Sequence, residues 1–151
     1  MTDIYIPRQL SPILRKAAGE FPAVILVGPR QSGKTTLLRI LFGEQYPIIS
    51  LEPPDVRLAA QSDPRGFLNL YPAPIVFDEI QYAPGLLPYI KEKIDTNRSK
   101  TGQYILTGSQ NLLLMSQVTE SLAGRAAVLK LMPLTRREIA RMAENNFPWE
   151  N

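Results

Sequence analysis

The chain has 151 residues, with 17 basic and 14 acidic side chains and a formal net charge of +3. It is long enough to bury the core of one domain. It contains no cysteine and no histidine, which excludes a disulfide framework, a thiolate metal site and a histidine general base. The mild charge favours a solvated surface over a nucleic-acid-binding one. Because there is no long apolar run and no signal-peptide pattern, we expect a cytoplasmic protein without a membrane segment.

Hydrophobic patterning predicts strands that alternate with helices. Within a lead-in of residues 1–21, apolar residues share one helical face and Gly19 ends the helix. Strands are predicted at 23–27, 47–51, 73–79, 103–107 and 126–132. Further helices are predicted at 33–42, 55–60, 64–70, 84–98, from Ser109 or Asn111 to Ala123, and at 135–143. This alternation predicts an α/β fold with a parallel sheet covered on both faces, in one domain of residues 1–144 with a tail at 145–151.

The segment between the first predicted strand and the next helix fits the phosphate-loop pattern G-x-x-x-x-G-K-[ST]. In such a loop, backbone N–H groups and the helix N-terminus bind phosphate, Lys34 reaches the β- and γ-phosphates, and Thr35 can ligate Mg²⁺. An ordinary glycine turn is the alternative, and Arg30 either touches phosphate or points outward. The predicted nucleotide contacts are Gly28, Pro29, Arg30, Gln31, Ser32, Gly33, Lys34, Thr35 and Thr36.

The predicted strand at 73–79 ends in Asp78 and Glu79, an arrangement that resembles the Walker B pattern. Ligands of open α/β sheets bind at the carboxyl ends of the strands, so Asp78 is the second candidate for holding Mg²⁺. Glu79 is the candidate for orienting or deprotonating the attacking water. A capped loop would also explain two adjacent acids, but the adjacent acid favours an ATPase over a kinase or a GTPase.

Small polar residues follow the strand at 103–107. If this strand lies between the two strands that carry the motifs, Thr107, Ser109 or Gln110 could hold the attacking water together with Glu79. This element resembles a sensor-1 segment. A helix N-cap at Ser109 or Asn111 is the compatible alternative.

Gly124 and Arg125 precede the last predicted strand. Arg125 could be an arginine finger, in its own subunit or toward a neighbour, that neutralises charge on the transferring phosphoryl group. A plain helix C-cap followed by a charged residue is the alternative.

Five segments in this order resemble the prokaryotic AAA-type ATPases that usually carry a C-terminal domain of unknown function. They are GPRQSGKTT at 28–36, VFDEIQ at 76–81, LTGSQ at 106–110, SLAGR at 121–125 and LMPLTRREI at 131–139. The resemblance covers residues 4–140 and implies a three-layer αβα P-loop core with strand order 5-1-4-3-2. It assigns the family's phosphate-loop residues to Lys34 and Thr35, and its Walker B acids to Asp78 and Glu79. The family's sensor segment corresponds to residues 107–110, and its Gly-Arg pair corresponds to residues 124–125.

Members of that family continue well beyond the last segment. The helical lid and the partner-recognition domain are therefore expected to be absent from this chain, which is a fragment or a short member. The leading hypothesis is an ATPase that uses ATP and Mg²⁺, with Glu79, Lys34, Arg125 and Gln110 as catalytic residues. The alternative is an ATP-dependent switch with little turnover that presents a surface to another protein or to DNA. Homo-oligomerisation is compatible with both.

Overall fold

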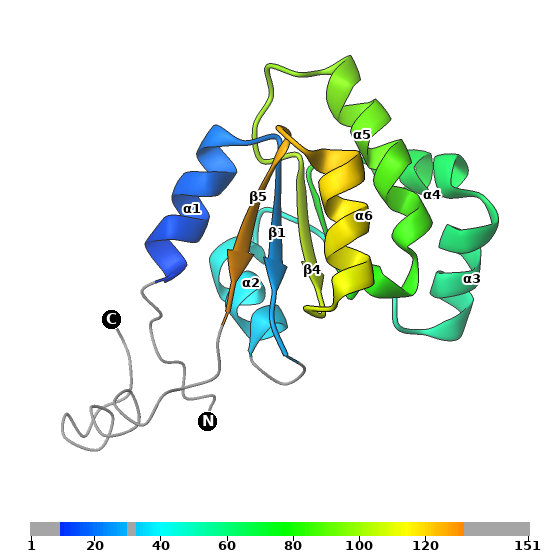
Figure 1. The fold of residues 1–151 in the computed structure, drawn as a ribbon, viewed down its shortest axis with the longest axis horizontal. Coiled ribbons are helices and arrows are strands. Elements are labelled where there is room, and N and C mark those ends of the chain that lie inside the picture. The colour runs from blue at the N-terminus through cyan, green and yellow to red at the C-terminus, as the bar shows by residue number, and fades with distance from the viewer. Residues whose placement is uncertain (1–9, 30–32, 132–151) are drawn as a thin grey trace.

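The computed structural model describes residues 10–29 and 33–131 of the chain (Figure 1). The predicted helix at 135–143, the tail at 145–151 and the predicted phosphate contacts Arg30, Gln31 and Ser32 lie outside these residues.

Five parallel strands form a single sheet. They are β1 (Ala23–Val27), β2 (Ile48–Ser50), β3 (Ile75–Asp78), β4 (Tyr104–Gly108) and β5 (Ala126–Lys130). Their spatial order is β2-β3-β4-β1-β5, which is the predicted order 5-1-4-3-2 read from the other edge. The α/β fold and the strand order are therefore confirmed.

Helices cover both faces of this sheet (Figure 1). On one face lie α1 (Leu10–Glu20) and α2 (Lys34–Phe42), and their apolar residues share a core cluster with the sheet. The other face carries α3 (Pro54–Ser62), α4 (Pro64–Leu70), α5 (Leu87–Thr96) and α6 (Leu112–Leu122). Two 3-10 turns, η1 (Ile80–Tyr82) and η2 (Pro84–Leu86), link β3 to α5. The result is the three-layer architecture that the resemblance implied.

The central strand β1 is apolar at every position because the sheet is covered on both sides. Its residues are no more than 1% exposed. Val24 and Leu26 face α1 and α2, whereas Ile25 and its alternate neighbours face the larger cluster with α5 and α6. A strand buried on two faces cannot show the alternating pattern of a half-exposed strand, so its sequence reads as one unbroken apolar run.

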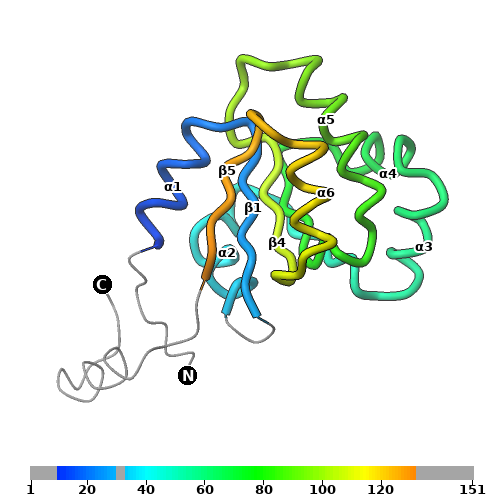
Figure 2. Tube along the Cα trace, viewed as in Figure 1, coloured from blue at the N-terminus to red at the C-terminus, as the bar shows by residue number. Residues whose placement is uncertain are grey.

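Parallel strands bring their carboxyl ends to one edge of the sheet, at the bottom of Figures 1 and 2. We call this the carboxyl edge and its opposite the amino edge. β4 lies between β1 and β3, as the sensor hypothesis required. The N–H of Gly28, where the phosphate loop begins, donates to the carbonyl of Gly108 at the tip of β4 over 3.3 Å. The two motif-bearing strands and the sensor segment therefore meet at the carboxyl edge.

Several boundaries differ from the predicted ones. The helix expected at 84–98 begins as η2 and becomes α5 only at Leu87, since Pro84 and Pro88 restrict the first turn. Of the two proposed caps for α6, Asn111 is the one that caps the helix. No helix among the described residues is long and apolar enough to cross a membrane.

Candidate functional site

The phosphate loop leads into α2 through a left-handed residue. Gly33 has φ 91° and ψ 15° and occupies the N-cap position of α2. A side chain would be strained in this conformation, which explains the glycine of the motif. Gly33 has no side chain to cap the helix, so the first N–H groups of α2 are not covered by a capping side chain. Such a terminus suits an anion.

Lys34 contacts the first two residues of the phosphate loop. Its side chain is largely buried, with 6% of the residue exposed. The Nζ atom donates to the carbonyl oxygens of Gly28 and Pro29 at 2.9 and 2.8 Å. The ammonium group is thus held at the carbonyls that open the loop, and its role toward a phosphate stays a prediction.

Thr35 and Asp78 come from different motifs and meet directly. The hydroxyl of Thr35 lies 2.9 and 3.1 Å from the two carboxylate oxygens of Asp78. Asp78 ends β3 and is only 8% exposed. The structure therefore joins the two residues that the sequence predicts as metal ligands.

This hydroxyl–carboxylate pair suits a hard cation. Magnesium is usually held by one or two carboxylates together with substrate phosphates and waters, and not by a cage of protein ligands. Among residues 10–29 and 33–131, no group of three or more His, Cys, Asp or Glu side chains could hold a metal ion. Thr35 and Asp78 are thus two oxygen donors that could hold such an ion together with ligands from outside the protein.

Thr107 lies near the carboxyl end of β4, and its hydroxyl contacts other groups than those predicted. Its hydroxyl donates to Asp78 Oδ1 at 2.5 Å and accepts the backbone N–H of Glu79 at 2.9 Å. The residue is fully buried, with 0% exposure. The prediction that Thr107 contacts the nucleotide or the attacking water is therefore not supported, because its hydroxyl is engaged inside the protein. It orients Asp78 and Glu79 instead.

Glu79 stands at the start of η1 in an unusual conformation. Its backbone has φ 65° and ψ 56°, and among the described non-glycine residues it alone has positive φ. Such strain persists only where the surrounding structure enforces it, and it is common at functional sites. The side chain is half-buried, and its Oε1 accepts from the amide of Gln81 at 3.3 Å.

Gln81 was not among the predicted site residues. Its Oε1 also accepts the backbone N–H of Ser109 at 3.2 Å, so it links Glu79 to the sensor segment. The only signal in the sequence was its place two residues after Glu79, inside the VFDEIQ segment.

Ser109 and Gln110 lie at the carboxyl edge, directly after β4. Ser109 is half-buried and Gln110 is exposed. Ser109 Oγ accepts from the side-chain amide of Asn111 at 2.9 Å. Thr36 is exposed in the first turn of α2. The roles of these residues toward a nucleotide stay predictions.

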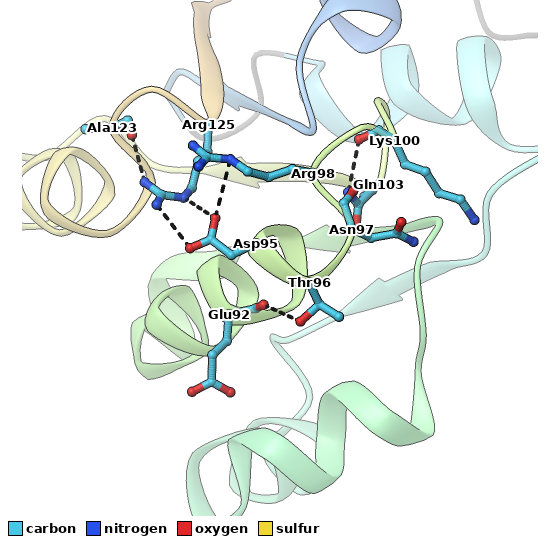
Figure 3. Close-up of polar contacts among 9 residues, drawn as sticks. All are labelled: Glu92, Asp95, Thr96, Asn97, Arg98, Lys100, Gln103, Ala123 and Arg125. Atoms are coloured by element: carbon cyan, nitrogen blue, oxygen red, sulfur yellow. Dashed lines mark hydrogen bonds and ion pairs between the residues drawn. The ribbon is translucent and has the colours of Figure 1, made fainter.

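Arg125 lies at the amino edge, away from the phosphate loop. The next residue, Ala126, pairs with Ala23 at the start of β1, whereas the loop follows Val27 at its end. At about 3.3 Å per residue, the strand separates Arg125 from the loop by roughly 16 Å. Arg125 makes a two-pronged ion pair with Asp95 of α5 at 2.7 and 3.1 Å (Figure 3). The prediction of an arginine finger toward its own subunit's phosphate is therefore wrong, and a role toward a neighbouring subunit stays a prediction.

Comparison with known proteins places this geometry in a family. A family model described as an AAA domain matches residues 20–140. The chain belongs to the AAA domain family. Two curated relatives, the uncharacterized proteins Rv2008c of Mycobacterium tuberculosis and Mb2031c of Mycobacterium bovis, are each 33% identical over 135 residues. The match covers 89% of this chain, and the chain spans only 30% of the length of each relative.

Solved structures share the fold of this AAA domain. The Walker-type ATPase PABY2304 of Pyrococcus abyssi superposes with a TM-score of 0.62 at 21% identity, covering 95% of this chain and 59% of that one. A DNA replication initiation factor superposes with a TM-score of 0.54 at 14% identity, covering 91% and 48%. At these identities the likeness extends to the P-loop ATPase fold alone.

Proposed function

We propose that this AAA domain binds ATP with Mg²⁺ and hydrolyses the bond between the β- and γ-phosphates. The observation that carries the proposal is the contact between Thr35 and Asp78, which joins the two motifs beside Lys34. Family membership supports a nucleotide site of this kind.

Each residue would act through its position at the carboxyl edge. The loop N–H groups and Lys34 would bind the β- and γ-phosphates, and Thr35 and Asp78 would hold Mg²⁺, which when bound neutralises charge on the phosphate oxygens. Glu79 would orient a water and take its proton during attack on the γ-phosphorus. Ser109 and Gln110, directly after β4, would complete the surroundings of that water.

The position of Arg125 favours the alternative, a nucleotide-dependent switch with slow turnover. Arginine fingers accelerate phosphoryl transfer about 10³–10⁵-fold, and Arg125 is held at the amino edge by Asp95. Rapid hydrolysis would then need an arginine from a second copy or another partner protein. A DNA partner is a weaker alternative, and its binding should weaken as salt rises.

Thermal unfolding with and without Mg-ATP tests the nucleotide site. At ATP near 100 times Kd, binding adds about 2.7 kcal/mol. For a domain of this size, that corresponds to a rise of roughly 5–10 °C in the midpoint. Lys34→Ala should abolish the rise. Because Lys34 also binds the loop carbonyls, its variant is judged by the ligand-induced shift and not by its own midpoint. An undiminished shift in Lys34→Ala would refute the assignment.

Hydrolysis is tested separately with Glu79→Gln. This variant should keep the full ATP-induced shift and lose turnover, because the amide cannot take a proton from water. Single-turnover assays distinguish the two functions. A switch shows tight binding with negligible product over many minutes, in the wild type as well as in the variant.

A further inference from the structure

The turn that follows Glu79 is held firmly on several sides. Ile80 is 0% exposed. Tyr82 stacks under the guanidinium of Arg57, 4.2 Å from its ring centre, and its carbonyl accepts from the Gln61 amide at 2.8 Å. Helix α3, which supplies both partners, thus anchors the far end of η1. Gln81 sits in the middle of this anchored turn.

Gln81 bridges two strand ends through its side-chain amide. Its Nε2 donates to Glu79 Oε1 at 3.3 Å, and its Oε1 accepts the Ser109 N–H at 3.2 Å. These partners determine the orientation of the amide. The reversed orientation would put oxygen against a carboxylate and an NH₂ group against an N–H.

The sequence of β4 makes room for this bridge at Gly108. A Cβ at that position would lie 3.4 Å from Gln81 Oε1, 3.1 Å from Ile80 Cγ2 and 2.7 Å from Leu114 Cδ2. The 2.7 Å distance would force the end of the Leu114 side chain to shift, and the 3.1 Å distance is tighter than most Cβ contacts. The glycine therefore lets η1 pack directly on the strand tip, which brings Gln81 within reach of Ser109.

We propose that Gln81 is the positioning residue for Glu79 and for the sensor segment. This inference rests on the proposed hydrolysis. The bridge uses one carboxylate oxygen of Glu79, which leaves the other able to accept a proton from water. The same amide holds the backbone of Ser109, so one side chain determines the spacing between the two groups that would surround the attacking water. Hydrogen bonds of this kind are often long without ligand and shorten in the reactive complex.

Four variants test whether Gln81 positions Glu79 for catalysis or only stabilises the turn that follows it. Gln81→Met keeps the volume and removes both hydrogen bonds. Gln81→Glu keeps an acceptor for the Ser109 N–H and removes the donor to Glu79. Gln61→Met is the matched control, because it removes a hydrogen bond to the same turn without touching Glu79. Glu79→Asp shortens the carboxylate out of reach of Gln81 and provides a background with residual turnover.

We expect Gln81→Met and Gln81→Glu to lower kcat about 10–100-fold, the loss typical of a misplaced reactive group. The ATP-induced thermal shift should stay within experimental error, since no phosphate contact is removed. Gln61→Met should lower kcat less than about 3-fold. When Gln81→Met is added to Glu79→Asp, kcat should fall little further than in Glu79→Asp alone, because the effects of coupled residues are non-additive.

The proposal is overturned if Gln81→Met keeps the wild-type kcat or if Gln61→Met lowers kcat as much as Gln81→Met does. It is also overturned if the reductions in kcat caused by Gln81→Met and Glu79→Asp multiply in the double variant. A wild-type chain that binds ATP without turnover would overturn the proposed hydrolysis and this inference together. Turnover in the wild type with no loss in the Gln81 variants would overturn only the inference.

Discussion

A single buried hydroxyl organises the acidic residues of the site. Thr107 donates to Asp78 and accepts from the N–H of Glu79, whose backbone is left-handed. The sequence indicated a polar residue at the tip of this strand. It could not show that the hydroxyl is directed toward β3 and away from solvent. The contact depends on β4 lying beside β3, which brings residues 29 positions apart into hydrogen-bonding distance.

At the scale of the residue, we predict that Thr107→Val destabilises the fold by about 1–3 kcal/mol, because it leaves the Glu79 N–H without its partner and removes one of the two hydroxyl groups bound to Asp78 Oδ1. Valine is nearly isosteric and favours strands, so lost packing would not explain the change. Urea denaturation measures the effect. Thr107→Ser keeps the hydroxyl, so its free energy of unfolding should fall much less than that of Thr107→Val. Equal stability of the valine variant and the wild type would contradict the role assigned to the hydroxyl.

At the scale of the element, the start of α6 joins the sensor segment to a helix. Asn111 has extended backbone angles, and its Oδ1 accepts the N–H of Leu114 at 2.7 Å, which is the N-cap arrangement. The other side of its amide donates to Ser109 Oγ. The conformation of residues 109–111 is thus tied to the end of a helix that packs firmly through Leu114 and Val118.

We predict that Asn111→Ala costs about 1 kcal/mol of stability, the usual loss of an N-cap side chain. Asn111→Asp keeps the acceptor for Leu114 and should retain most of that stability, although it can no longer donate to Ser109. Chemical denaturation of the three proteins checks this. If the aspartate variant were as unstable as the alanine variant, the bond to Ser109 and not the cap would be the important contact.

At the scale of the whole molecule, the two edges of the sheet carry different kinds of residue: motif residues at the carboxyl edge and a structural ion pair at the amino edge. The carboxyl edge carries the phosphate loop, Asp78 and Glu79. The amino edge carries an ion pair in which Arg125, just before β5, holds Asp95 near the end of α5 (Figure 3). The hydrogen bond from Arg125 lowers the pKa of Asp95 below its ordinary value of 3.8. This contact joins α5 to the junction of α6 and β5 on the helical face.

The lowered pKa of Asp95 gives the stability of the chain a pH dependence with a definite sign. The ion pair contributes stability above pH 3.8 and loses that contribution as the pH falls through the lower folded-state value. We therefore predict that Asp95→Asn lowers the unfolding midpoint near neutral pH and that the two proteins converge once the pH falls below the lowered pKa of Asp95. Thermal unfolding across this range measures the difference.

Glu92→Gln is the control for this measurement. Glu92 lies on α5, as Asp95 does, and forms an ion pair with Arg65 of α4 in which the two side chains are 58% and 60% exposed. In the Arg125–Asp95 pair the side chains are only 18% and 36% exposed. Because more exposed pairs are screened more strongly, Glu92→Gln should change the midpoint less. A pH-independent effect of Asp95→Asn would contradict the role of the ion pair.

Local patterns in the sequence were enough to predict most of the elements and to single out the motif residues that the structure brings to the carboxyl edge. The unbroken apolar run of β1 indicated a doubly covered strand. The Gly33-Lys34-Thr35 segment and the acids after β3 are short motifs whose backbone setting defines their geometry. Thr35 and Asp78, the two predicted Mg²⁺ ligands, lie in contact, and their role toward the metal stays a prediction. The strand order was implied by the family resemblance and not by periodicity, and it is confirmed.

The remaining features depend on contacts between segments that are distant in the sequence. Nothing near Thr107 or Gln81 shows which side chain each will meet, because those partners are brought together only when β3 and β4 pair and η1 packs on Gly108. The position of Arg125 is decided in the same way. Its strand runs parallel to β1, which puts a residue that precedes β5 at the edge opposite the phosphate loop. Local sequence determines the motifs and the strands that carry them, because these depend on neighbouring residues. Only the tertiary structure decides which side chains face one another, because strand pairing and packing determine those distances.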